Sequence, residues 1–286
     1  MKTPLLVKFF IDGQNFHNRL KDFNVTIEKV NYPVFFDHIL EKIRTHRKNH
    51  TTEESSDSPL PIQFLKAEWY AVQDTLINYY PYGTMKKIHL RKHVDNKNGN
   101  FWKHLIHYDT RHKKFPSRYK EIFNCEKRID ELVAEKAIES IKQTKGRLLK
   151  IEKEYKGKGV IHDGTQLDLI KIKFSGFLKI KYETRTWEEK GLDTAVACQM
   201  IASCLNTSND QLHEDVDDVV PDYNSDIIVL ISSDMDFMEA FKILHALKVP
   251  CYMVHITNKL PKDLNGIHPC CAHLEISEND VKKYLI

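Results

Sequence analysis

The chain has 286 residues, of which 41% are hydrophobic and 29% charged, and its formal net charge is +3. This length fits one elaborated domain, or one domain with an insertion, and can bury a sizeable core. No run of 18 apolar residues is present, and the short apolar stretch at the start is interrupted by Lys8, so we expect neither a membrane span nor a secretion signal. The six cysteines form no CxxC pair. They therefore favour reduced thiols in a cytoplasmic protein over a structural zinc site.

Apolar segments that alternate with helical patterns indicate the fold class. The candidate strands are residues 5–12, 62–72, 177–182, 226–234 and 251–256. Between them, residues 33–43, 192–205 and 237–247 carry apolar side chains at helical spacing. This order predicts an α/β fold in which a mainly parallel, five-stranded sheet has helices on both sides.

The segment at residues 85–171 does not fit this alternation. Its second half, residues 119–156, has apolar residues at near-helical spacing among dense charges, which predicts one or two long helices interrupted near Gly146. We therefore expect a core formed by residues 1–84 and 172–286, with a basic, partly helical insertion at residues 85–171.

Basic and aromatic residues are concentrated in the first half of that insertion. From Lys86 to Lys120 there are eleven Lys or Arg, two acids and five histidines. Cations can meet phosphates and rings can stack on bases, so the stretch predicts a nucleic-acid-binding surface, although a charge run alone is more often a solvated loop. The candidate contacts are Lys86, Lys87, Arg91, Lys92, Trp102, Lys103, Arg111, Lys113 and Lys114.

An acidic segment follows the helical pattern at residues 192–205. Residues 207–226 contain seven acids and no Lys or Arg. The loop at residues 206–226 is therefore a candidate docking segment for a protein partner.

Carboxylates follow two of the candidate strands. Asp234 and Asp236 come directly after one apolar strand, while Asp12 and Asn15 come at the end of the first. Ligands of open α/β sheets bind at the carboxyl ends of the strands, and carboxylate oxygens suit Mg²⁺ or Mn²⁺. We expect a cation site there, with Asp12 and one of the Asp234/Asp236 pair as direct ligands.

Helix capping is the alternative interpretation of these acids. An aspartate after a strand is often an N-cap, and Asp193 or Asp236 taken singly fits that role as well as it fits a site. Capping by all four aspartates together is less probable than a shared site. Lys190 and Arg185 are either solvated or placed to contact phosphate.

Three blocks in chain order carry a family resemblance. FFIDGQNF, EKGLDTAVACQM and VLISSDMDF resemble the signature blocks of the NYN family of PIN-like (LabA-like) ribonucleases. The resemblance covers residues 5–80 and 175–275 and implies a PIN-like three-layer α/β/α sandwich. Ser233 stands where the family usually has glycine. The family's acidic cluster falls on Asp12, Asp193, Asp234 and Asp236, with Asn15 as its polar partner and Lys190 as the lysine of its block.

The resemblance implies a Mg²⁺- or Mn²⁺-dependent endoribonuclease. Asp12, Asn15, Asp193, Asp234 and Asp236 would be the catalytic residues, and the four aspartates would hold the metal. The alternative is a catalytically inactive NYN-fold protein that binds RNA or regulates a partner. No GxSxG block, P-loop or GxGxxG is present to indicate another chemistry.

Overall fold

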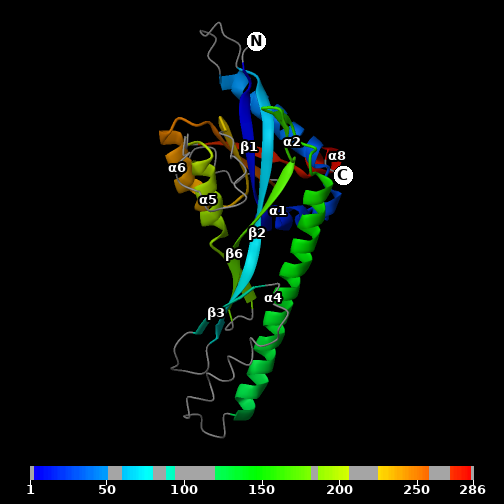
Figure 1. The fold of residues 1–286 in the computed structure, drawn as a ribbon, viewed down its shortest axis with the longest axis vertical. Coiled ribbons are helices and arrows are strands. Elements are labelled where there is room, and N and C mark those ends of the chain that lie inside the picture. Colours follow the sequence, from blue (N-terminus) through cyan, green and yellow to red (C-terminus); the bar gives the residue numbers. More distant parts are fainter. Residues whose placement is uncertain are drawn as a thin grey trace. The chain divides into compact units, whose positions relative to one another are not determined.

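The computed structural model describes residues 3–50, 60–79, 88–93, 120–181, 186–205, 225–257 and 271–284. The chain forms two compact units. Figure 1 labels their helices and strands. The first comprises Met1–Tyr70, Leu149–Lys173 and Asp193–Ile286, and the second comprises Ala71–Leu148 and Phe174–Leu192. The expected boundary at 84/85 lies outside the described residues, and the one at 171/172 falls inside strand β6 (Ile170–Lys181).

The first unit contains most of the helices and strands. Its elements are β1 (Leu5–Asp12), α1 (Gly13–Asp22), η1 (Ile27–Lys29), α2 (Tyr32–His50), β4 (Ile161–His162), β5 (Thr165–Gln166), α5 (Leu192–Ala202), β8 (Ile227–Ile231), η3 (Met235–Phe237), α6 (Met238–Ala246), β9 (Cys251–Ile256), β10 (Ala272–Ile276) and α8 (Glu278–Tyr284). The second unit contains β3 (Ile88–His93) and β7 (Thr186–Lys190). Three elements divide more evenly between the units, namely β2 (Ile62–Tyr79), α4 (Lys120–Glu154) and β6, and the first residue of α5, Leu192, also belongs to the second unit.

The central sheet is mostly parallel. Its strands follow the order β10-β9-β8-β1-β2-β6-β7, and β3 pairs with β2 as an eighth strand. The neighbours from β10 to β2 are all parallel, whereas β2 with β3 and β6 with β7 are antiparallel. The predicted α/β class is confirmed, but the predicted number of five strands is wrong. The prediction missed β3, β7 and β10, which lack the long apolar run of a strand buried on both faces.

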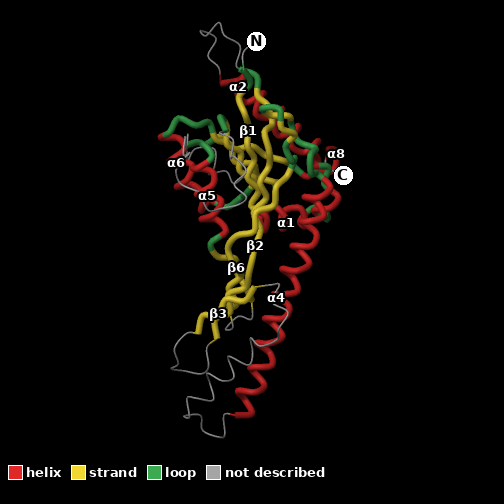
Figure 2. Tube along the Cα trace, in the orientation of Figure 1, coloured by secondary structure: helices red, strands yellow, loops and turns green. Residues whose placement is uncertain are grey.

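Alternate residues of β1 show that helices cover both faces of the sheet in the first unit. Phe9 packs on Phe36 of α2, with ring centroids 5.1 Å apart. The preceding residue, Lys8, points the other way and donates a hydrogen bond to Ser203, just after α5. Figure 2 shows α5 and α6 on one side of β1, with α1 and α8 on the other. Successive side chains of a strand point to opposite faces, so β1 contributes to both layers of the core.

An ion pair lies inside the sheet beside β1. Lys8 and Glu68 are both fully buried, with Nζ and Oε1 3.3 Å apart. Glu68 also pairs with Lys66 at 3.2 Å and accepts a hydrogen bond from the Tyr70 hydroxyl at 2.8 Å. Because Lys8 also donates to the Ser203 hydroxyl at 2.8 Å, this network joins β1, β2 and the end of α5.

The long helix of the insertion is continuous. α4 runs from Lys120 to Glu154 through Gly146, so the predicted interruption at that glycine is wrong. A glycine costs a helix only about 1 kcal/mol relative to alanine, which the buried face of α4 can offset. None of the helices among the described residues has the length and apolar character needed to cross a membrane.

Gly13 marks the point where the backbone turns from β1 into α1. A Cβ atom there would lie 2.3 Å from the Tyr70 carbonyl oxygen and 2.4 Å from Trp69 Nε1, whereas one on Gly146 would meet nothing within 4 Å. We expect Gly13→Ala to lower the free energy of unfolding by at least about 3 kcal/mol, because backbone must move to admit the methyl group. Gly146→Ala is the matched control and should gain about 1 kcal/mol. Urea unfolding of both variants measures this, and a Gly13→Ala protein as stable as wild type contradicts the close approach.

Candidate metal centre at the carboxyl edge of the sheet

Strands β1 and β8 end side by side. They are parallel, with Ile11 opposite Ile231, so the next residues of each strand, Asp12 and Ser232, meet at the same edge. The Ser232 hydroxyl donates to Asp12 Oδ2 at 2.7 Å. The sheet topology therefore joins two sequence blocks that lie 220 residues apart.

Asp12 is buried at this edge and is the N-cap of α1. Its Oδ1 accepts the Asn15 backbone N–H at 3.2 Å, and only 5% of the residue is exposed. Burial raises the pKa of the Asp12 carboxyl to about 6, because the charged form loses its hydration. The hydrogen bonds from Ser232 and Asn15 oppose this rise in pKa, while the negative charges of Asp193 and Asp234 add to it.

A network of hydrogen bonds holds the turn after β8. The Ser233 N–H donates to the Asn15 side-chain oxygen at 3.1 Å, and the Asp234 N–H donates to the Ser232 hydroxyl at 3.0 Å. Asp234 in turn caps η3, since its Oδ1 accepts the Asp236 N–H at 3.0 Å. The chain leaves the extended conformation at this turn. The turn brings the carboxylates of Asp234 and Asp236 to one place.

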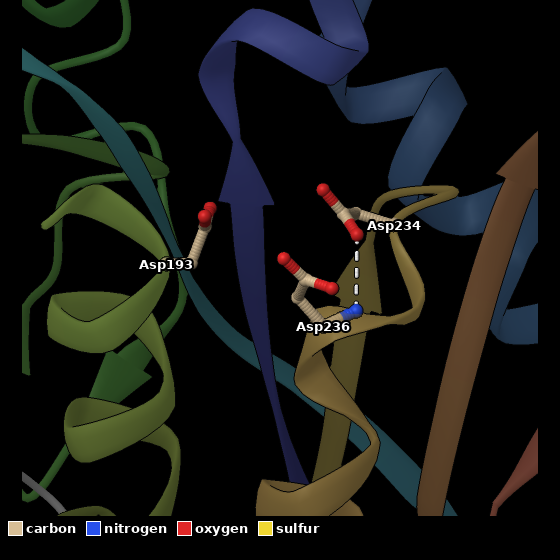
Figure 3. Close-up of side chains that lie close together, drawn as sticks. All are labelled: Asp193, Asp234 and Asp236. Atoms are coloured by element: carbon tan, nitrogen blue, oxygen red, sulfur yellow. Dashed lines mark hydrogen bonds between the residues drawn. The ribbon is translucent and has the colours of Figure 1, made fainter. Parts of the chain in front are cut away.

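Three carboxylates converge above the sheet edge. Asp193 comes from the first turn of α5, and Asp234 and Asp236 come from the turn after β8 (Figure 3). One oxygen from each lies within 4.8 Å of the other two. An octahedral ion with oxygens at 2.0–2.1 Å would space its ligands by about 3 to 4 Å, so small side-chain movements suffice to bind it. The donor set consists only of carboxylate oxygens, which fits Mg²⁺ or Mn²⁺.

Asp12 lies next to this group but is not part of it. Both of its oxygens accept hydrogen bonds, from Ser232 and from Asn15. Burial is the main cause of its raised pKa, and the nearby charges of Asp193 and Asp234 add a smaller rise. The structure thus gathers Asp193, Asp234 and Asp236 into one group and places Asp12 and Asn15 in the network that supports it. Direct metal binding by Asp12 stays a prediction.

The capping interpretation also applies in part. Asp12 and Asp234 are N-caps, and Asp193 and Asp236 lie in first turns of helices. Capping explains where each residue sits along the chain, but it does not require acids from α5 and from the β8 turn to approach one another. That approach costs electrostatic energy without a bound cation.

The predicted nucleic-acid contacts fall largely outside the described residues. Lys190 is exposed at the end of β7. Arg91 and Lys92 belong to β3, where side chains are not described. The predicted contacts that lie outside the described residues are Arg185, Lys86, Lys87, Trp102, Lys103, Arg111, Lys113 and Lys114.

Most of the acidic segment at residues 206–226 also lies outside the described residues, which resume at Ser225. Its last residue, Asp226, accepts the backbone N–H of Leu6 at 2.8 Å. Asp226 therefore fixes the start of β8 against β1.

Ser232 is the supporting residue that the sequence analysis missed. Its buried hydroxyl donates to Asp12 and accepts from the Asp234 backbone, so it connects the two blocks. The sequence does contain a pattern that could have indicated this role, because Ser232 directly follows a buried strand and lies two positions before Asp234.

No protein-family model, curated protein or solved structure matches the chain.

Proposed function

We propose that this chain is a Mg²⁺- or Mn²⁺-dependent endoribonuclease of the NYN type, on a PIN-like sandwich, acting in the cytoplasm. The observation that carries the proposal is the approach of Asp193, Asp234 and Asp236, which come from two separate parts of the sequence. The resemblance of the three sequence blocks and the basic, aromatic stretch between Lys86 and Lys120 favour RNA as the substrate.

The residues at this edge of the sheet would have different roles in phosphodiester hydrolysis. Asp193, Asp234 and Asp236 would hold the divalent ion, which when bound stabilises negative charge at the reacting phosphate and activates water. Asn15 and Ser232 keep the β8 turn in place through their hydrogen bonds to Ser233 and Asp234. The buried Asp12 adds negative charge beside the three ligands and so strengthens the attraction for a cation.

Cleavage of labelled RNA tests the proposal. Wild type should cut RNA with Mg²⁺ or Mn²⁺ and lose this activity in excess chelator. Asp193→Asn and Asp234→Asn should each cut at least about 100-fold more slowly, since a metal ion contributes several kcal/mol to the transition state. Asp37→Asn removes an exposed carboxylate from α2 and is the matched control, which should cut like wild type.

Binding measurements separate the alternatives. If the protein is an inactive RNA-binding protein, wild type and Asp234→Asn should both bind RNA. Neither should cut RNA in the presence of any metal ion, and Mn²⁺ binding should not depend on Asp193. Cleavage that survives unchanged in both aspartate variants contradicts the assignment of the site. Cleavage of a circular RNA distinguishes endonuclease from exonuclease action, because a circular RNA has no free end for an exonuclease.

A further inference from the structure

A second cluster of metal-ligating side chains lies on β9 and β10 and is independent of the proposed function. Cys271 directly precedes β10, and His273 is the second residue of that strand. Side chains two residues apart on a strand share a face. His255 comes from β9, which is parallel to β10 with Met253 opposite His273.

The His273 ring lies between Cys271 and His255 and contacts each through a different nitrogen. Cys271 Sγ lies 3.6 Å from His273 Nε2, and the other ring nitrogen of His273, Nδ1, lies 2.8 Å from His255 Nε2. The two imidazole planes are 25° apart. When His273 donates its Nδ1–H to His255, its Nε2 lone pair faces the thiol.

We propose that Cys271 and His273 bind a transition-metal ion of the Zn²⁺ class, with His255 orienting the His273 ring. A tetrahedral zinc ion at about 2.3 Å from sulfur and about 2.0–2.1 Å from nitrogen holds these two atoms about 3.6 Å apart. The observed separation of Cys271 Sγ and His273 Nε2 matches that spacing. A histidine that binds a metal commonly donates its other N–H to a fixed partner, which is the position of His255.

The ligand types separate this cluster from the carboxylates. Thiolate and imidazole select zinc-like ions, whereas Asp193, Asp234 and Asp236 offer only the oxygens that Mg²⁺ prefers. The cluster is also shielded, since 8% of Cys271 and 1% of His255 are exposed. The described residues supply two direct ligands and leave two positions of the ion open. The sequence signature of this cluster is a Cys-x-His at the start of β10, which differs from the CxxC pairs of common zinc sites.

Cysteine alkylation of the reduced full chain tests the proposal without any substitution. Zn²⁺ should slow the reaction of Cys271 with iodoacetamide by at least about 10-fold, because a metal-bound thiolate is less available. The exposed Cys198 is the internal control and should react at the same rate with and without Zn²⁺. Mg²⁺ should protect neither thiol. Equal rates for Cys271 with and without Zn²⁺ overturn the proposal.

Cobalt substitution and affinity measurements complete the test. Protein loaded with Co²⁺ should show a thiolate-to-metal charge-transfer band that Cys271→Ser abolishes and Asp234→Asn retains. His255→Gln should weaken Zn²⁺ binding by about 10- to 100-fold, measured against a chromophoric chelator, and His162→Gln on the β4–β5 hairpin should not. Absence of the band, its persistence in Cys271→Ser, or equal affinity in wild type and His273→Gln overturns the assignment.

Discussion

Replacement of Asp12 by asparagine is expected to make the metal-free protein more stable at neutral pH. Burial raises the pKa of the Asp12 carboxyl from an ordinary 3.8 to about 6. At 1.36 kcal/mol for each unit, the ionised side chain costs the folded state about 3 kcal/mol. Asparagine removes the charge and keeps an oxygen that accepts the Asn15 N–H. Its amide nitrogen cannot accept the hydrogen bond that Ser232 donates to Asp12 Oδ2. We therefore expect the free energy of unfolding to rise by about 1 to 3 kcal/mol.

The pH dependence of stability gives an independent measure of the same group. The folded state retains the Asp12 proton up to about pH 6, while the unfolded chain releases it near pH 3.8. The contribution of Asp12 to stability therefore falls as pH rises through this window. Lowering the pH from 7 to 5 should recover about 1 kcal/mol in wild type, and Asp12→Asn should lose this component.

Urea unfolding at pH 5, 6 and 7 without divalent ions measures both effects. Asp37→Asn, which removes an exposed carboxylate, controls for the change in net charge. At the same Mn²⁺ concentration, wild type should be stabilised more than Asp12→Asn, because the stability that a ligand adds to the folded state rises with the logarithm of its affinity. An Asp12→Asn protein that is less stable than wild type at pH 7 would show that hydrogen bonding, not charge burial, dominates at this position.

The parallel core could be predicted from the sequence because its strands are buried on both faces. β8 is a continuous apolar run followed by Ser232, and β1 is apolar except for the buried Lys8 and its last residue, Asp12. β10 alternates between buried and half-buried residues. β7 contains two glutamates among its five residues. Strands at the ends of the sheet pair on one side only, so their sequences carry a weaker signal.

The approach of Asp193, Asp234 and Asp236 could be predicted from the sequence, whereas the hydrogen bonds around them and the separate position of Asp12 could not. Acids after β1 and β8 are expected to meet, because parallel strands present their carboxyl ends at one edge. The hydrogen bonds of Ser232 and Asn15 depend on the turn geometry after β8, which no spacing rule supplies. The separate position of Asp12 arises from the same cause, since both of its oxygens are engaged by this turn and by α1.

The buried ion pair in the sheet has the largest expected effect on stability. Glu68→Gln is expected to lower the free energy of unfolding by about 3 to 5 kcal/mol, because it leaves the buried Lys8 without its counterion. Lys66 also pairs with Glu68, but its side chain is 16% exposed and can reach water. Loss of the Lys66–Glu68 pair should therefore lower the free energy of unfolding by less than loss of the Lys8–Glu68 pair. Lys66→Met is therefore the matched control and should lose less than Glu68→Gln.

A second substitution decides whether the charge itself is responsible. Lys8→Met in the Glu68→Gln background removes the uncompensated cation and should restore part of the lost stability, although the Ser203 hydroxyl then loses its donor. A double variant less stable than Glu68→Gln would show that the Lys8 contacts to Ser203 and Phe10 outweigh its charge.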